Sequence, residues 1–168
     1  MLRSIAAVLL FVGILSTWGV AQAVVGMKAP DITSPIWLNS APLRMAELKG
    51  KVVMVEFWTF GCYNCRNIEA YVKQWQQKYL EEGLVVIGVH SPEFSHERNV
   101  ENVRRYLKEH EIRFAVPIDN DFSAWNNYGN RYWPALYLID KEGIVRYIRV
   151  GEGGYRETER QIQSLLAE

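Results

Sequence analysis

The sequence predicts an α/β fold in which a central mixed β-sheet carries helices on both faces. Two apolar runs of strand length, at 51–58 and 84–90, are continuous rather than alternating, which is typical of strands buried on both faces. Segments with the apolar spacing of helices follow each run, and a strand–turn–strand pattern precedes a last helical segment. This order favours one layered domain, for which a chain of 168 residues is long enough.

The first half of the chain supplies two strands and a helix. KVVMVEFW at 51–58 is a strand whose apolar run is interrupted by Glu56, and LVVIGVH at 84–90 is the second strand. Between them, one apolar helix face ends before Gly83; its members are Ile68, Tyr71, Val72, Trp75 and Tyr79.

The second half predicts two longer helices, over about 99–110 and 155–166, around several shorter elements. RFAVPID at 113–119 is a short strand, and FSAWNNYG at 122–129 is a short helix or a turn. PALYLID and IVRYIRV form a hairpin, because Gly143 between them suits a tight turn.

The amino terminus has the layout of a secretory signal. Arg3 is followed by an apolar run from Ile5 to Leu15 and by the triplet Ala21-Gln22-Ala23. We predict a signal peptide over 1–23, cleaved after Ala23, and a domain over 28–168; an uncleaved anchor is the alternative, because residues 5–25 are nearly long enough to span a membrane. In either case the domain is expected to be exported, in a periplasmic or other extracytoplasmic compartment where disulfides persist.

Charge balance excludes one broad class of function. The 19 basic residues equal the 19 acidic residues in number, so no global field recruits nucleic acid or an anionic membrane surface.

The chain has two cysteines, Cys62 and Cys65, just past the first strand and at the start of the first helix. Free N–H groups and the helix dipole favour a thiolate there, and cysteines in such places have pKa values of roughly 3.5 to 7.5. Cys65 lies one helical turn later, within reach of Cys62 and better covered. The pair is therefore asymmetric: Cys62 is the candidate nucleophile and Cys65 the candidate resolving cysteine.

Three separated pieces of sequence carry a resemblance to a known family. FWTFGCYNC, the acidic residue in the preceding strand, and YWPALYLIDKEGIVRYIRVGEG resemble the thioredoxin-like superfamily, specifically exported TlpA/ResA-type thiol–disulfide oxidoreductases. GVHSPEF together with NRYWPALYLID is most similar to the thioredoxin-like module of DipZ/CcdA-type proteins. The resemblance extends over about residues 28–166 and implies a thioredoxin-like fold.

The resemblance implies roles for further residues. Glu56 would lie beneath the second cysteine and accept its proton, and Pro134 would follow a cis peptide bond beside the disulfide. Trp133 would offer its backbone to a target polypeptide, although a bulky indole departs from the small or β-branched residue common there. The other substrate-facing candidates are Trp58, Tyr63 and Asn64.

These features predict a thiol–disulfide oxidoreductase, and a reductase in preference to an oxidase, with the Cys62–Cys65 disulfide as its redox centre and no other cofactor. The resemblance implies a membrane dithiol donor of the CcdA or DsbD kind and an apocytochrome c cysteine pair as a target. The direction of electron flow stays open.

Other functions remain as alternatives. A peroxiredoxin-like thiol peroxidase would use Thr59, three residues before Cys62, but Val55 stands where that family's motif has proline. A copper carrier would use two thiolates and a histidine, although such proteins usually space the cysteines one residue wider. His90, Glu93 and His96 lack a convincing metal-ligand spacing. The segment SPEFSHERNVENVRRYLKEHE is interpreted as a loop and a solvated helix, a possible partner surface.

Overall fold

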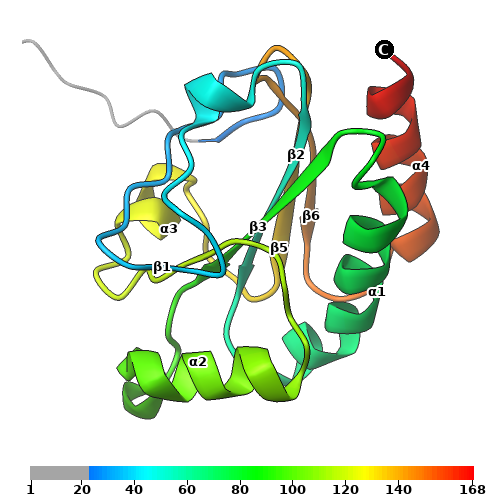
Figure 1. Cartoon of the computed structure of the whole chain (residues 1–168). Coiled ribbons are helices and arrows are strands. Elements are labelled where there is room, and N and C mark those ends of the chain that lie inside the picture. Colours follow the sequence, from blue (N-terminus) through cyan, green and yellow to red (C-terminus); the bar gives the residue numbers. More distant parts are fainter. Residues whose placement is uncertain (1–22) are drawn as a thin grey trace, which may run out of the picture.

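The computed structural model describes residues 23–168 and is built around a four-stranded mixed sheet (Figure 1). The strand order is β3-β2-β5-β6, with bounds Leu84–His90, Val52–Trp58, Ala135–Ile139 and Val145–Val150. β2 is parallel to β3 and antiparallel to β5, which is antiparallel to β6. The predicted mixed sheet is therefore confirmed, and Gly143, with φ of 84°, lies in the predicted turn between β5 and β6.

A second, two-stranded sheet was not predicted. β1 (Trp37–Leu38) pairs antiparallel with β4 (Val116–Pro117). The predicted strand at 113–119 thus shrinks to two residues, and it approaches β3 through isolated bridges at Ile87–Ala115 and His90–Ile118. Pro117 lacks an N–H group, which limits how far this strand extends as a ladder.

Helices cover both faces of the central sheet. In Figure 1, α1 (Tyr63–Tyr79) and α4 (Tyr155–Ala167) lie together on one side, and the short α3 (Ser123–Asn127) lies on the other. α2 (Val100–Glu109) lies across one end of the fold, and one-turn 3-10 helices occur at η1 (Met45–Leu48) and η2 (Ser95–Arg98). The layers predicted from the sequence are therefore present.

The side chains of β2 divide between two cores, as the alternation of a strand requires. Met54 and Trp58 pack in the cluster that includes residues of α1, α2 and α4, whereas Val53, Val55 and Phe57 pack in the cluster beneath α3. Burial on both faces explains why this strand is apolar at nearly every position. Glu56 lies on the same face of β2 as Met54 and Trp58, so it points into the cluster on the α1 side.

The strand directions bring three chain segments to one edge of the sheet. Trp58, at the carboxyl end of β2, pairs with His90 at the carboxyl end of β3. Because β5 is antiparallel, its first residue, Ala135, pairs with Phe57 at this same edge. The predicted cysteines, His90 and Pro134 therefore converge although they are far apart in sequence.

The structure differs from the prediction at Tyr71 and shows further contacts near the start of the described residues. Tyr71, predicted inside α1's apolar face, is partly exposed and stacks on Tyr155 of α4 at 3.7 Å between ring centroids. Chain contacts also begin before residue 28, since the Gly26 N–H donates to the Val145 carbonyl at 2.8 Å.

The predicted leader over 1–23 lies almost wholly outside the described residues. Within residues 23–168, no helix combines the length and the apolar character needed to cross a membrane.

Candidate active site

Cys62 and Cys65 are joined in a disulfide at the beginning of α1, as predicted, with their Cα atoms 5.3 Å apart. Cys62 is the N-cap residue of the helix, with extended backbone angles, and the Cys65 N–H donates to its sulfur at 3.2 Å. Both cysteines are buried, Cys65 slightly more than Cys62. A sulfur at an N-cap, with a backbone N–H directed at it, is placed where the helix favours a negative charge.

Glu56 lies in the interior beside this helix start. Its side chain is 3% exposed and shares a sheet face with Leu136 and with the cluster that contains Cys65. Desolvation, and to a lesser degree the negative charge of Glu69, raises the pKa of Glu56 to about 8. A carboxyl with such a pKa accepts and returns a proton near neutral pH, which is the property that a base acting on a thiol needs.

A glycine in the neighbouring strand makes room for two aromatic side chains. Gly88 of β3 is paired with Glu56, and a Cβ there would meet Phe114 Cε2 at 2.5 Å and Trp58 Nε1 at 2.8 Å. Trp58 is only 4% exposed and packs in the same buried cluster as both cysteines, because it belongs to the inward-facing set of β2 residues. A contact between Trp58 and the substrate stays a prediction.

His90 is fully buried at the same sheet edge. Its Nε2 lies 3.2 Å from Thr59 Oγ1, and its ring packs edge-on against that of Trp58 and stacks with that of Phe60. Its Nδ1 has no hydrogen-bond partner within the described residues. Desolvation lowers the pKa of His90 to about 4, against the opposing effect of the Glu97 charge. The residue is thus a neutral core imidazole at physiological pH.

The burial of His90 predicts an acid limit to stability. Its pKa falls from 6.5 to about 4 on folding, so the unfolded chain binds the extra proton and the contribution of His90 to stability is lost as pH falls through this window. Between pH 4.5 and 6.5 the raised pKa of Glu56 acts in the opposite direction, so the His90 contribution is measured as a difference from wild type. The loss amounts to about 3 kcal/mol in the free energy of unfolding. Urea unfolding at a series of pH values measures it: between pH 6.5 and 4, His90→Gln should gain in free energy of unfolding relative to wild type, whereas the exposed control His96→Gln should not. A difference between His90→Gln and wild type that does not change with pH would contradict the assignment.

The loop before β5 completes the site. The Trp133–Pro134 peptide bond is cis, and Pro134 is buried. The Trp133 indole is half-buried: its Nε1–H donates to the Ser91 carbonyl at 2.9 Å, and its ring lies 4.2 Å from that of Trp125. The indole is therefore anchored in the protein by a hydrogen bond and by packing against Trp125.

Three side chains are open to solvent around this region. Tyr63 and Asn64, between the cysteines, are exposed, and Tyr63 is 70% exposed. Tyr132, next to Trp133, is 61% exposed and was not predicted as a site residue. Tyr63 and Asn64 are thus accessible from solvent, and their contact with a substrate stays a prediction.

Glu97 is a buried residue of the site that the sequence interpretation missed. The segment that contains it was predicted to be solvated, yet its carboxylate is fully buried and accepts the Gly61 N–H at 2.7 Å, one residue before Cys62. A weak signal for it was present: a glutamate three residues after the first residue of a helix start can accept that residue's N–H, as Glu97 does from Phe94. The full capping-box pattern is missing, because the phenylalanine side chain cannot accept a hydrogen bond.

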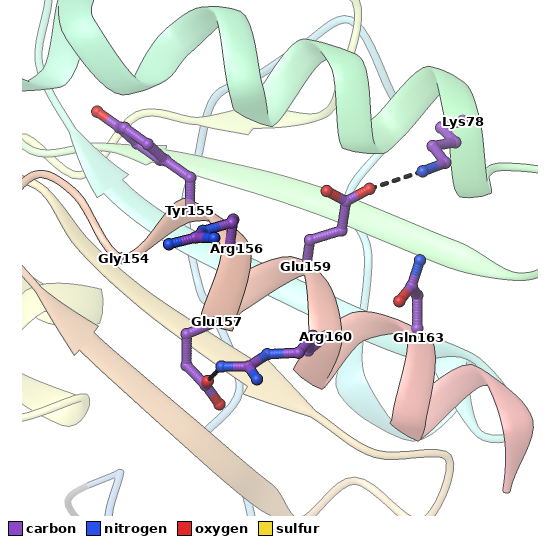
Figure 2. Close-up of a pocket in the computed structure, with 8 residues that line it drawn as sticks. All are labelled: Lys78, Gly154, Tyr155, Arg156, Glu157, Glu159, Arg160 and Gln163. Carbon is purple, nitrogen blue, oxygen red and sulfur yellow. Dashed lines mark hydrogen bonds and ion pairs between the residues drawn. The ribbon is translucent and has the colours of Figure 1, made fainter.

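A large surface groove lies away from these residues. It has a volume of about 880 Å³ and lies beside α4 and the distal end of α1 (Figure 2). Four of its charged side chains form two ion pairs, Lys78 with Glu159 at 2.7 Å and Arg160 with Glu157. None of the predicted site residues lines it. Within residues 23–168 there is also no group of three or more His, Cys, Asp or Glu side chains arranged to hold a metal ion.

A disulfide that follows a central strand, above a buried carboxyl and beside a cis-proline loop, places the chain in the thioredoxin-like class of redox proteins. The chain belongs to the AhpC/TSA family, whose sequence pattern matches residues 25–148.

Relatives agree with this class. Over 152 residues the chain is 42% identical to Protein DipZ of Mycobacterium tuberculosis; the match includes 88% of this chain but only 22% of DipZ. It is 28% identical to the thiol-disulfide oxidoreductase YkuV of Bacillus subtilis, over 83% of this chain and 94% of that protein. Among solved structures, a thiol:disulfide interchange protein of the thioredoxin family from Chlorobium tepidum superposes with a TM-score of 0.71 at 26% identity, over 87% and 99% of the two chains.

Proposed function

We propose that this chain catalyses thiol–disulfide exchange with polypeptide targets through Cys62 and Cys65. The observation that carries the proposal is the disulfide at the N-terminus of α1, where Cys62 caps the helix and accepts the Cys65 N–H. The thiol–disulfide oxidoreductases among its relatives support the same chemistry.

The proposed cycle begins with the reduced chain. The Cys62 thiolate attacks one sulfur of a target disulfide, forms a mixed disulfide and releases the other target sulfur as a thiolate that takes up a proton. Glu56 then takes the proton of the Cys65 thiol, and the resulting thiolate attacks the Cys62 sulfur. The second target sulfur leaves as a thiolate that takes up a proton, so the target is released as a dithiol. The target has gained two electrons, and Cys62 and Cys65 have lost two in forming their disulfide.

Three parts of the structure support this division of roles. Cys62 is the cysteine at the helix terminus, where the dipole favours its thiolate. Glu56 is buried on the side of the sheet where Cys65 packs, with a pKa of about 8. The exposed Tyr63 and Asn64, together with the backbone of Trp133, are proposed to contact the target.

The cellular setting is a further part of the proposal. The predicted leader supports export to a periplasmic or other extracytoplasmic site, with the domain free or anchored by that leader. A membrane dithiol protein of the CcdA or DsbD kind is proposed to return electrons to the disulfide, and an apocytochrome c cysteine pair is a proposed target. The resemblance of the sequence to DipZ/CcdA-type modules supports these partners.

Reduction of a disulfide-bonded protein substrate tests the proposed activity. With excess dithiol as the electron source, we expect the chain from residue 24 onward to accelerate release of substrate thiols at catalytic concentrations. Peroxide consumption is measured in parallel, because a peroxidase that uses Thr59 is the alternative function. In the structure the Thr59 hydroxyl is hydrogen-bonded to His90. Peroxide consumption without disulfide reduction would overturn the proposal in favour of that alternative.

A further inference from the structure

The segment between β3 and α2 holds a carboxylate in an unusual setting. Glu97 is fully buried although its neighbours His96 and Arg98 are exposed. One oxygen, Oε2, accepts the backbone N–H groups of Glu93 at 2.6 Å and Phe94 at 2.7 Å. These bonds fix the side chain on its own segment and satisfy a buried charge that would otherwise be costly.

The second oxygen connects this segment to the disulfide. Oε1 accepts the N–H of Gly61 at 2.7 Å, across 36 residues of sequence. Gly61 is the residue before Cys62, and a Cβ at Gly61 would collide with Oε1. The close approach therefore requires both the glycine and the glutamate, and it holds the peptide that leads into the N-cap of α1.

We propose that Glu97 is a positioning residue for the dithiol, which favours the Cys62–Cys65 disulfide over the reduced pair by holding Gly61. This inference rests on the proposed function. Two effects act in the same direction. With its preceding peptide held, reduced Cys62 stays close to Cys65, so that ring closure costs less entropy. The buried negative charge next to Cys62 also opposes the thiolate that reduction produces there.

The equilibrium with glutathione measures this effect. Two glutathione thiols reduce the Cys62–Cys65 disulfide to two protein thiols and yield one glutathione disulfide, so the two-electron balance is complete. In Glu97→Gln the charge is gone, and the single amide oxygen cannot serve both Gly61 and the Glu93 and Phe94 N–H groups. We expect the constant for forming the protein disulfide to fall about tenfold, equivalent to a couple about 30 mV more oxidising.

Matched variants separate positioning from a loss of charge or of general stability. Glu93→Gln removes an exposed charge from the same segment and should leave the constant at its wild-type value. Gly61→Ala keeps the Glu97 charge but displaces its oxygen, so the constant should fall in the same direction by a smaller factor. Both substitutions break the same contact, between Gly61 and Glu97. The constant of the double variant should therefore resemble that of Glu97→Gln alone, and the two effects should not add.

A purely structural role gives a different result. It would weaken the oxidised and reduced forms equally, leaving the glutathione constant unchanged while both unfold more easily; that outcome in Glu97→Gln and Gly61→Ala overturns the inference. If Glu97→Gln does not fold, the result for Gly61→Ala decides. Wild-type protein that shows no reversible couple with glutathione would instead contradict the proposed function itself.

Discussion

Cys65→Ser should accumulate a mixed disulfide between Cys62 and its target, whereas Cys62→Ser should lose exchange activity completely. Cys62 caps α1 and receives the Cys65 N–H, so its sulfur is the one that the helix activates for attack. Without the Cys65 sulfur nothing inside the protein displaces the product, and the intermediate persists. Non-reducing electrophoresis after mixing the reduced variant with a disulfide-bonded protein measures the trapped species.

The reciprocal outcome would contradict the assigned order of attack. If Cys62→Ser trapped the target and Cys65→Ser did not, Cys65 would be the nucleophile. A double variant, Cys62→Ser with Cys65→Ser, is the control for non-covalent association, and it should form no linked species.

Glu56→Gln should slow the resolving step by about a hundredfold or more, the usual range for loss of a general base. Glu56 is buried, with a pKa of about 8, and the amide cannot take the Cys65 proton. In the wild type the rate of resolution should rise with pH until Glu56 is ionised, at about 8, and this rise should be absent from the variant. Quenched-flow measurement of decay of a preformed mixed disulfide reports this step alone.

Initial attack by Cys62 provides the internal control, since Glu56→Gln should change it little. A fall in both steps by the same factor would point to a distorted site rather than to a lost base. A resolving rate with an unchanged pH profile would remove Glu56 from the mechanism.

The same substitution should make the protein more stable at alkaline pH. The pKa of Glu56 rises from 4.5 to about 8 on folding, so the folded state holds the proton longer, and stability falls as pH rises through this interval. The full shift in the pKa of Glu56 corresponds to a loss of about 5 kcal/mol in the free energy of unfolding by pH 8. Relative to wild type, Glu56→Gln should therefore gain in free energy of unfolding between pH 4.5 and 8, as measured by urea unfolding.

Much of the fold follows from local patterns in the sequence. The continuous apolar runs at 51–58 and 84–90 predicted strands buried on both faces, and the two cores on either side of β2 account for them. The periodic residues Val72 and Trp75 predicted the buried face of α1 correctly. β1 was missed, because two residues in a proline-containing segment produce no periodicity, and their pairing with β4 depends on tertiary contacts.

The site was predictable where chemistry is concentrated at adjacent residues. Cys62 and Cys65 carry their spacing in the sequence, and Glu56 is conspicuous as an acid within an apolar strand. Glu97 lies in a polar segment whose composition is typical of a solvated surface, and its burial depends on the distant Gly61. Trp58 was named as a substrate-facing candidate from its proximity to the cysteines in sequence, which does not reveal how deeply its side chain is buried.

The measurement that most directly tests the redox assignment is the midpoint potential of the Cys62–Cys65 couple, followed by tryptophan fluorescence in graded dithiol buffers. Trp58 packs in the same buried cluster as both cysteines, so its emission should report their state. We expect one reversible two-electron transition. A midpoint potential near that of thioredoxin, roughly −270 mV, is expected for a reductant, whereas a value of about −120 mV would make the protein an oxidant. Absence of any reversible transition, with Cys62→Ser behaving as wild type, would contradict thiol–disulfide exchange as the function.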